Sequence, residues 1–461
     1  MVTKELLGEA AKVSPPLHFT DHDMSELASQ AISEARFWRR SVSSLLIYRE
    51  VFQDPVGQAY VTLLEALGAG HQLQSLEAYG LWFQSLAHTN QSWATYLLRR
   101  ILQDENPFSL HVQQRVSEVP EALLQAAQQD LQILQRFYQL SPLELSRWVQ
   151  QVCQLPQPPL AWQLPDEAFP GSGLSQLPNW ATSIGELTNH YRRHGTGLLS
   201  QYRAYRWQQG RLRGIEYPDP VQLENLAAYD TPRQTLIQHT EHFLAGYPAL
   251  HTLLYGSRGS GKASLIKALL NRYYPRGLRL VEVAKADLRD LPTIVDRLRA
   301  APHRFIVFVD DLSFEDDDEA FKALKVVLEG SVTARPDNVV VYATSNRRHL
   351  VREYFAERPR PHDQDDIQAW DTLQEKLSFS DRFGLSLTFE PADQATYLTI
   401  VKHLAAQAGI TLSETELLPR ALQWATRHNG RSGRSARQFI DFLQAEEAMA
   451  AYNGHPDKSA Q

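Results

Sequence analysis

The chain has 461 residues, of which 43% are hydrophobic and 21% are charged, a composition typical of globular proteins that excludes disorder throughout. Its 46 Lys and Arg residues against 53 Asp and Glu residues give a net charge of −7, so no overall positive field exists to hold nucleic acid non-specifically. The only cysteine, Cys153, excludes a disulfide framework and a zinc site built from several cysteines.

No stretch of the sequence resembles a membrane span. The longest apolar runs, such as Phe305 to Val309, fall well short of the roughly 18 residues that a span needs. The N-terminus also lacks the apolar segment of a signal peptide, because charged residues flank Leu6 and Leu7. We therefore expect a cytoplasmic protein with no membrane partner, which also suits its sparing use of cysteine.

Residues 1–154 are predicted to form a helical N-terminal domain, because apolar residues recur there at three- and four-residue spacing and glycines are few. Ser141 and Glu144 flank a proline in the pattern of a capping box, which is typical of a helix start. We expect its tryptophans to pack in the core rather than to serve as stacking platforms or partner anchors; they are Trp38, Trp82, Trp93 and Trp148. Nothing in this domain indicates chemistry, so it is the candidate contact for an unknown protein partner.

The next two segments connect this domain to the rest of the chain. Residues 155–180 are predicted to be a linker, because six prolines and two glycines disfavour both helix and central strand. In residues 181–221 arginines alternate with aromatics, as in Tyr202 to Trp207. Such a segment can contact single-stranded nucleic acid, or it can be an amphipathic helix whose aromatics pack while its arginines stay in water. We favour the packed helix, because the segment leads directly into the next domain.

Beyond residue 221, short β-branched runs alternate with helical stretches, which is typical of a parallel sheet with helices on both faces. The predicted strands are Leu253–Tyr255, Leu280–Val283, Phe305–Val309, Val339–Tyr342 and Ser386–Phe389. We expect an α/β domain over residues 222–390 and a small helical domain over residues 391–461, where no strand pattern remains.

The strongest motif is a glycine-rich loop between an apolar strand and a helix; it reads Gly256-Ser257-Arg258-Gly259-Ser260-Gly261-Lys262. Its three glycines let the backbone curl so that N–H groups converge on phosphate oxygens, and the helix presents its positive end to the same anion. Lys262 would reach the β- and γ-phosphates of a nucleoside triphosphate. The sequence therefore predicts a phosphate-binding loop.

This loop departs from the usual pattern at one position. Ala263 stands where a Ser or Thr hydroxyl would ligate Mg²⁺, and Ser264 lies about 100° further round the helix. Water could take the place of the missing ligand, because Mg²⁺ commonly keeps several waters. The sequence thus indicates nucleotide binding more firmly than rapid hydrolysis.

Polar residues follow two further predicted strands. Asp310 and Asp311 end one of them, and Asn346 comes after the next. Ligands bind at the carboxyl ends of parallel strands, so we expect Asp310 to position Mg²⁺, directly or through water. Asp311 or Glu315 would orient the attacking water, and Asn346 would hydrogen-bond the γ-phosphate or that water.

In this order, the motifs resemble those of the AAA+ ATPases and are most similar to the bacterial domain-of-unknown-function 815 family, from Tyr191 to Leu443. The motifs that carry the resemblance are Leu226-Ala227-Ala228-Tyr229, the loop Gly256–Lys262, Val309-Asp310-Asp311-Leu312-Ser313-Phe314-Glu315, Ala343-Thr344-Ser345-Asn346, Lys376-Leu377-Ser378-Phe379-Ser380-Asp381-Arg382-Phe383-Gly384 and Gly433-Arg434-Ser435-Ala436-Arg437-Gln438-Phe439. The resemblance implies an α/β P-loop NTPase fold, in which a parallel sheet flanked by helices carries a small helical lid. Here that module follows an all-α N-terminal domain, and Mg-ATP is expected between the sheet and the lid.

The resemblance also implies roles for residues around the nucleotide. The loop from Gly256 to Ser264, with Lys262, binds phosphate, and Tyr229 lies near adenine. The lid contributes a sensor arginine, which is Arg437 or, alternatively, Arg434.

On the catalytic side, the resemblance assigns Mg²⁺ to Asp310 and the first sensor to Asn346. Arg382 resembles an arginine finger that acts on the ATP of a neighbouring subunit, although for Arg382 by itself a surface ion pair is the alternative. The usual Asp-Glu pair is Asp-Asp here, so Asp311 is one methylene shorter and Glu315 is expected to assist it. The acidic stretch Glu353–Asp371 is predicted to be a surface loop.

We therefore expect an ATP-binding AAA+ ATPase that couples its nucleotide cycle to remodelling of a partner macromolecule, as a homo-oligomer. Two alternatives stay open. Ala263 favours a nucleotide-sensing binding module that hydrolyses ATP weakly or not at all. The arginine–aromatic segment favours a DNA-associated loader or helper ATPase, although nucleic acid is the less favoured partner.

Overall fold

The computed structural model describes residues 21–114, 118–165, 172–313, 319–329, 336–346, 379–428 and 430–453. The chain forms two compact units, one of residues 1–112 and 116–190 and the other of residues 113–115 and 191–461. Within the described ranges, no helix combines the length and the apolar character that crossing a membrane requires. The loop predicted over Glu353–Asp371 lies outside these ranges.

The units divide after His190, and not at the predicted linker of residues 155–180. Several hydrogen bonds hold the proline-rich segment against the helical unit, and two of them involve aromatic side chains. The Tyr79 hydroxyl donates to Leu160 O at 2.8 Å, and Trp162 Nε1 donates to Gln91 O at 2.9 Å. Proline keeps a segment extended without preventing it from packing. The prolines therefore indicate an extended segment packed on the first unit, and not a linker between the two units.

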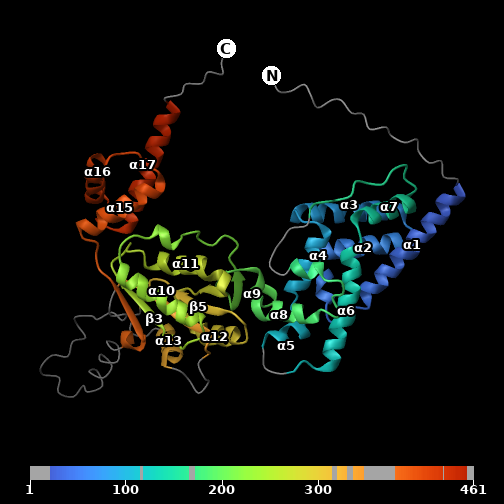
Figure 1. The fold of residues 1–461 in the computed structure, drawn as a ribbon, viewed down its shortest axis with the longest axis horizontal. Coiled ribbons are helices and arrows are strands. Elements are labelled where there is room, and N and C mark those ends of the chain that lie inside the picture. Colours follow the sequence, from blue (N-terminus) through green and yellow to red (C-terminus); the bar gives the residue numbers. More distant parts are fainter. Residues whose placement is uncertain are drawn as a thin grey trace, which may run out of the picture. The chain divides into compact units, whose positions relative to one another are not determined.

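The first unit is built from helices, as expected (Figure 1). They are α1 (Asp21–Ser43), α2 (Pro55–Ala69), α3 (Gln72–Thr89), α4 (Trp93–Gln103), α5 (Pro107–Gln113), α6 (Glu121–Gln139), α7 (Pro142–Cys153) and α8 (Ile184–His194), with short 3₁₀ helices η1 (Arg49–Phe52) and η2 (Ser172–Gln176). The predicted capping box is present at the start of α7.

Aromatic side chains fill the core of this unit. Trp82 and Trp93 are buried as predicted, and Tyr60 stacks on Trp93 with ring centroids 4.3 Å apart. Trp38 and Trp148 are only partly buried, because they lie at the margins of their helices' apolar stripes.

A buried carboxylate after α4 makes this unit sensitive to pH. Burial raises the pKa of Asp104 to about 6, although a hydrogen bond from Asn106 Nδ2 to Asp104 Oδ2 at 2.7 Å opposes the shift. An unfolded aspartate titrates near about pH 3.9, so the folded chain binds more protons between about pH 4 and pH 6. The free energy of unfolding should therefore fall as the pH rises through that window, by up to about 3 kcal/mol.

We expect Asp104→Asn to raise the free energy of unfolding at pH 7 by about 1–3 kcal/mol and to change it little at pH 4. Urea unfolding of the full chain, followed by tryptophan fluorescence at both pH values, measures this difference. Glu105→Gln, at the exposed neighbouring residue, is the matched control and should have little effect at either pH. Equal effects of Asp104→Asn at pH 4 and pH 7 would contradict the expectation.

The second unit contains a seven-stranded sheet with the strand order β2-β1-β4-β5-β6-β3-β7. Its strands are β1 (Ala204–Gln208), β2 (Arg211–Gly214), β3 (Thr252–Gly256), β4 (Leu278–Glu282), β5 (Arg304–Val309), β6 (Val339–Ser345) and β7 (Leu385–Phe389). All neighbouring strands are parallel except β1 and β2. The five predicted strands correspond to β3 to β7.

Helices cover both faces of this sheet (Figure 1). The helices α10 (Asp230–Leu244) and α11 (Lys262–Tyr273) pack on one face. On the other face lie η5 (Lys285–Asp290), α12 (Leu291–Arg299) and α13 (Glu319–Glu329). The expected architecture, an α/β sheet of mostly parallel strands flanked by helices after an all-α region, is confirmed.

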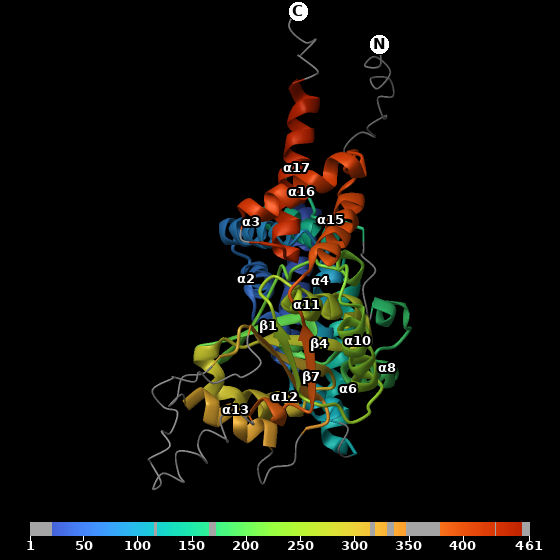
Figure 2. The same ribbon diagram turned by 90° about the vertical axis from the view of Figure 1, so that its left-hand side faces the viewer.

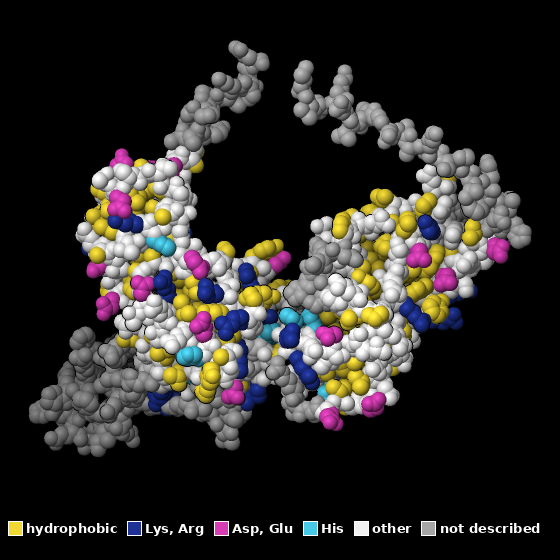
Figure 3. All heavy atoms as spheres, in the orientation of Figure 1, with side chains coloured by type: hydrophobic (Ala, Val, Ile, Leu, Met, Phe, Trp, Pro, Cys, Tyr) yellow, Lys and Arg dark blue, Asp and Glu magenta, His cyan; other side chains and the backbone are white. Residues whose placement is uncertain are grey.

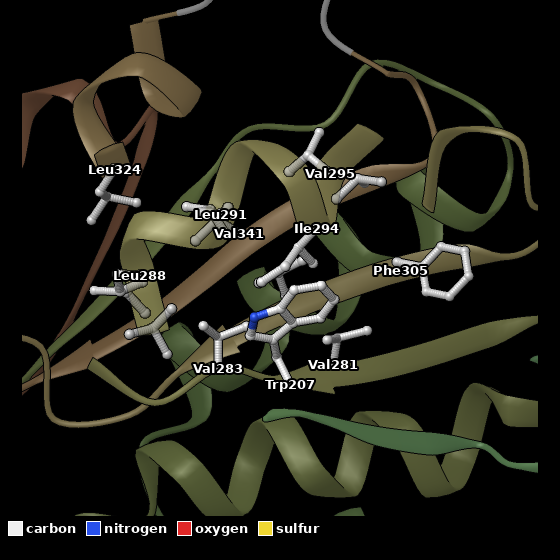
Figure 4. Close-up of a cluster of buried hydrophobic side chains, with 14 of the residues drawn as sticks. Trp207, Val281, Val283, Leu288, Leu291, Ile294, Val295, Phe305, Leu324 and Val341 are labelled. Atoms are coloured by element: carbon white, nitrogen blue, oxygen red, sulfur yellow. The ribbon is translucent and has the colours of Figure 1, made fainter. Parts of the chain in front are cut away.

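The first part of the arginine–aromatic segment is helical as predicted, because Tyr191 and Arg193 lie on α8 with Tyr191 buried and Arg193 exposed. The second part of the segment does not form the predicted amphipathic helix. After the short helix α9 (Gly197–Gln201), it forms the hairpin β1–β2, which extends the sheet beyond β4. Alternation along β1 buries Tyr205 and Trp207 and leaves Arg206 exposed, which is a two-residue period and not a helical one. Figure 4 shows the Trp207 ring among Val281, Val283 and Ile294. The expectation that the aromatics pack is therefore correct, but the element was wrong.

Three helices follow the sheet: α15 (Gln394–Ala408), α16 (Glu414–Arg427) and α17 (Gly433–Asn453). They lie together (Figure 2) around a small core of their own that includes Tyr397, Ala421 and Phe439. The loop that precedes α10 reaches this core through Ala227 and Ala228. These helices correspond to the lid that the resemblance implies.

Candidate nucleotide-binding site

A cavity of about 440 Å³ opens at the carboxyl edge of the sheet in the second unit. It is lined by the glycine-rich loop with the start of α11, the ends of β5, β6 and β7, the loop before α10 with the start of that helix, and the helices α15 and α17. Of the predicted site residues, the cavity brings together Tyr229, Arg258, Gly259, Ser260, Gly261, Lys262, Ala263, Ser264, Asp310, Asp311, Asn346, Arg434 and Arg437.

The loop runs from the end of β3 to the start of α11 and depends on its glycines. Gly256 has a φ of +138°, and a Cβ there would lie 1.9 Å from Phe389 O, so any side chain would collide with β7. Gly259 has a φ of +75°, and a Cβ there would lie 3.1 Å from the Cβ of Arg434. The second glycine thus lets the first turn of α17 approach the loop closely.

Lys262 is folded back onto the loop. Its Nζ donates to Gly256 O at 3.0 Å and to Ser257 O at 2.8 Å. Burial lowers the pKa of this ammonium group, and the charges of Asp310 and Asp311 oppose that shift. Gly256 and Ser257 do not line the cavity, because in this arrangement they supply the carbonyls that hold Lys262.

Two carboxylates enter the cavity from the turn after β5, and β6 holds that turn in place. The Thr344 hydroxyl donates to Asp310 Oδ1 at 2.5 Å and accepts from Asp311 N at 3.0 Å. Asn346 Nδ2 donates to Asp311 Oδ1 at 2.6 Å. Leu312 N donates to Thr344 O at 2.7 Å, which completes the link between the two strand ends.

The backbone explains why the second acid is aspartate. Asp311 has a φ of +51°, in the left-handed region that aspartate and asparagine adopt more readily than glutamate does. The sharp turn points consecutive carboxylates into one cavity. The sequence showed the Asp-Asp pair as a departure but carried no signal for this backbone conformation.

The cavity also holds cations without acidic partners. The guanidinium groups of Arg258, Arg434 and Arg437 are exposed, and none of them makes a hydrogen bond or ion pair with the described part of the chain. Arg233, by contrast, donates to Leu226 O and to Asp230 Oδ1, both at 2.6 Å. Among the described residues that line the cavity, Asp310 and Asp311 are the only acids, against these three arginines, Arg233 and Lys262. This part of the chain therefore gives the cavity an excess of positive charge that suits a polyanion.

The opposite end of the cavity is less polar. Ala228 and Tyr229 have φ values of +65° and +56°, a strained pair before α10. The Tyr229 hydroxyl donates to Glu390 O at 2.9 Å, and its ring packs on Phe389. With Ile400 and Leu404 of the lid, these residues give the cavity an apolar wall.

The Ala263 methyl group packs beside the core of the α11 face and offers no metal ligand. Ser264 lines the cavity, yet no hydrogen bond joins it to Asp310 within the described residues. The donor set still fits Mg²⁺, because Asp310 lines the cavity and its second carboxylate oxygen accepts no hydrogen bond from the described residues.

Arg382 is a predicted site residue that does not line this cavity. Arg382 ends η7 (Phe379–Arg382), before the first residue of β7, at the amino edge of the sheet. Glu315 lies outside the described residues. Sequence reasoning missed Thr344; its signal was a hydroxyl at the end of the strand beside the one that ends in the acids.

Comparison with known proteins places the chain in a family. Residues 200–447, more than half of the chain, match the family described as "Protein of unknown function (DUF815)". The chain belongs to this family. The resemblance drawn from the motifs is thus confirmed, and the match covers every part of the chain that lines the cavity.

Other similarities are more limited. A stretch of 71 residues is 37% identical to the Replication factor C large subunit of Staphylothermus marinus, which is 15% of this chain and 16% of the length of that relative. The structure of the Holliday junction branch migration motor RuvB of Thermotoga maritima shares 13% identity, with a TM-score of 0.30, over 48% of this chain and 72% of that one. The replication initiator DnaA bound to AMPPCP and single-stranded DNA shares 16% identity, with a TM-score of 0.32, over 52% of this chain and 70% of that one. Scores of this size carry no argument about this chain.

Proposed function

We propose that this chain is an AAA+ ATPase that binds Mg-ATP in the cavity and couples its hydrolysis to remodelling of a partner macromolecule. One observation carries the proposal: Lys262 and three arginines without acidic partners converge with Asp310 and Asp311 on a single cavity behind a glycine-rich loop. A triphosphate supplies the negative charge that these cations lack.

In this proposal, different residues bind the phosphates, hold Mg²⁺ and orient the attacking water. The loop N–H groups and Lys262 hold the phosphates, so Lys262 exchanges its bonds to Gly256 O and Ser257 O for phosphate oxygens. Asp310 holds Mg²⁺, which when bound neutralises charge on the phosphates. Asp311, kept in place by Asn346, accepts a hydrogen bond from the attacking water and orients it. Arg434 and Arg437 let the lid respond to the nucleotide.

A nucleotide-held switch is the second candidate, and Ala263 favours it. If metal binding is weak, the chain would hold ATP and release it largely unhydrolysed. The helix α17, which approaches the loop closely at Gly259, would then move with the loop when ATP binds or leaves. The two candidates share the binding site and differ in turnover.

The proposed partner is a protein that contacts the helical unit. Nucleic acid is less favoured, because Tyr205 and Trp207 are buried and cannot stack on bases. In the view of Figure 3, basic and acidic side chains are interspersed over the face that carries α11. Salt-dependent DNA binding that is lost on Arg203→Ala plus Arg206→Ala would reverse this preference.

Arg382 is proposed to act on the ATP of a second copy of the chain. Its position supports this role, because β7 runs parallel to β3 with Leu385 beside Thr252. Arg382 is therefore at least the length of β3, about 13 Å, from the loop of its own chain.

We expect Arg382→Ala to bind ATP within about twofold of the wild type and to lower turnover about 1000-fold. Mixing this variant with Lys262→Ala subunits, which lack their own phosphate contact but keep Arg382, should restore part of the phosphate release. A mixture no more active than the separate variants, under conditions in which they co-assemble, would contradict action between subunits.

Calorimetric titration of the wild-type chain with ATP, with and without Mg²⁺, tests the binding part of the proposal. Saturable binding of one nucleotide per chain, tighter with Mg²⁺, is the expected result. Absence of any saturable binding would overturn it.

A further inference from the structure

Thr344 makes the shortest hydrogen bond to either acid among the described residues. It lies on β6, is buried, and faces the turn after β5. Its hydroxyl has one proton, and the partners decide where that proton points. Because Asp311 N can only donate, the hydroxyl accepts from it at 3.0 Å and directs its own proton to Asp310 Oδ1 at 2.5 Å.

These two bonds fix the orientation of the Asp310 carboxylate. The hydroxyl takes one lone pair of Oδ1, and the remaining lone pairs of the Asp310 carboxylate can bind a ligand from the cavity that Asp310 lines. Hydrogen bonds from such outer partners orient metal-binding carboxylates and tune their affinity. Among the described hydroxyl groups that line the cavity, Thr344 alone is hydrogen-bonded to Asp310.

The hydrogen bond from Thr344 to Asp310 matters more because residue 263 is alanine. The first turn of α11 offers no hydroxyl beside the acids, since Ala263 has a methyl group and Ser264 makes no hydrogen bond to Asp310. The hydroxyl that meets Asp310 comes instead from the neighbouring strand.

We propose that Thr344 is the positioning residue of the Mg²⁺ site, and that its hydroxyl compensates from β6 for the one absent at Ala263. This inference rests on the proposed function, because it requires a nucleotide and Mg²⁺ in the cavity. Thr344 acts through Asp310 and does not itself touch the reacting atoms.

The test measures binding of a fluorescent ATP analogue to the full chain in EDTA and at increasing Mg²⁺. Thr344→Val removes the hydroxyl and keeps a β-branched side chain, whereas Thr344→Ser keeps the hydroxyl. Thr252→Val is the matched control, because Thr252 is equally buried in the same sheet but lies at the start of β3. Circular dichroism and the thermal midpoint establish that each variant is folded.

We expect Thr344→Val to raise the Mg²⁺ concentration needed for half of the metal-dependent gain in affinity about tenfold, with binding in EDTA unchanged. Thr344→Ser should stay within about twofold of the wild type, and so should Thr252→Val. Adding Ala263→Ser should lower the Mg²⁺ requirement by a larger factor in Thr344→Val than in the wild type, which a merely structural threonine would not produce.

Failure of the proposed function and failure of the inference about Thr344 give different binding results. If the wild type does not bind the analogue under either condition, the proposed function fails and the inference with it. If the wild type shows Mg²⁺-dependent binding and Thr344→Val shows the same Mg²⁺ requirement, the inference alone is wrong. Equal losses of affinity in EDTA and in Mg²⁺ would also overturn it, because Thr344 would then shape the cavity rather than the metal site.

Discussion

Lys262→Ala is expected to abolish ATP binding at the concentrations that saturate the wild type. The ammonium group is the most enclosed of the cations around the cavity, and it already lies within hydrogen-bond distance of the loop carbonyls. Hydrogen bonds to charged groups contribute about 1.5–3 kcal/mol each, and a lysine on a phosphate makes more than one. We therefore expect the dissociation constant for ATP to rise at least about 100-fold, measured by calorimetry.

Lys267→Ala provides the matched control for this prediction. Lys267 is on the same helix, is half-buried, and pairs with Asp219 at 3.2 Å outside the cavity. Its replacement should change the dissociation constant by less than about twofold. Equal losses in both variants would show that the helix, and not the Lys262 ammonium, is responsible. Undiminished ATP binding by Lys262→Ala would contradict the proposal that the glycine-rich loop and Lys262 hold the phosphates.

The second large effect is on the stability of the helical unit. Asp130 on α6 is fully buried, and its carboxylate accepts hydrogen bonds from the backbone N–H groups of Leu46, Ile47 and Tyr48 at 2.8 to 3.0 Å. These groups follow the end of α1, where the chain turns toward η1. Asp130 thus satisfies a turn that would otherwise bury three donors without acceptors.

Asp130→Ala should lower the free energy of unfolding by about 3 kcal/mol or more, because each orphaned buried donor costs about 1–3 kcal/mol. Asp130→Asn keeps one acceptor oxygen and should cost less. Urea unfolding followed by tryptophan fluorescence reports on this unit, because Trp82 and Trp93 form its core. Glu65→Ala, which breaks the exposed pair with Arg39, should cost less than about 1 kcal/mol. An Asp130→Ala effect no larger than this would contradict the role of the carboxylate.

Much of the α/β unit could be predicted because the patterns that indicate its strands and its phosphate loop lie within short stretches of sequence. A buried parallel strand is a short apolar run, and a phosphate loop is a run of glycines before a helix, so β3 to β7 and the residues Gly256 to Lys262 were evident. Asp310, Asp311 and Asn346 were also evident, because polar residues that end adjacent parallel strands meet at one edge.

The errors arose where the deciding interaction is distant in sequence. Tyr205 and Trp207 alternate with arginines, and only the edge of β4 makes that alternation a strand. The predicted linker is held in place by residues distant in sequence, as the bond from Trp162 Nε1 to Gln91 O, 71 residues earlier, shows. The role of Thr344 depends on the left-handed backbone at Asp311, which the sequence does not encode locally.

Steady-state phosphate release with Mg-ATP is the measurement that tests the central claim most directly, using the wild type, Ala263→Ser and Lys262→Ala. We predict weak turnover by the wild type, faster turnover by Ala263→Ser, and none above background by Lys262→Ala. Wild-type turnover equal to that of Lys262→Ala, with ATP still bound by the wild type, would contradict the claim of an ATPase. The chain would then be a nucleotide-held switch.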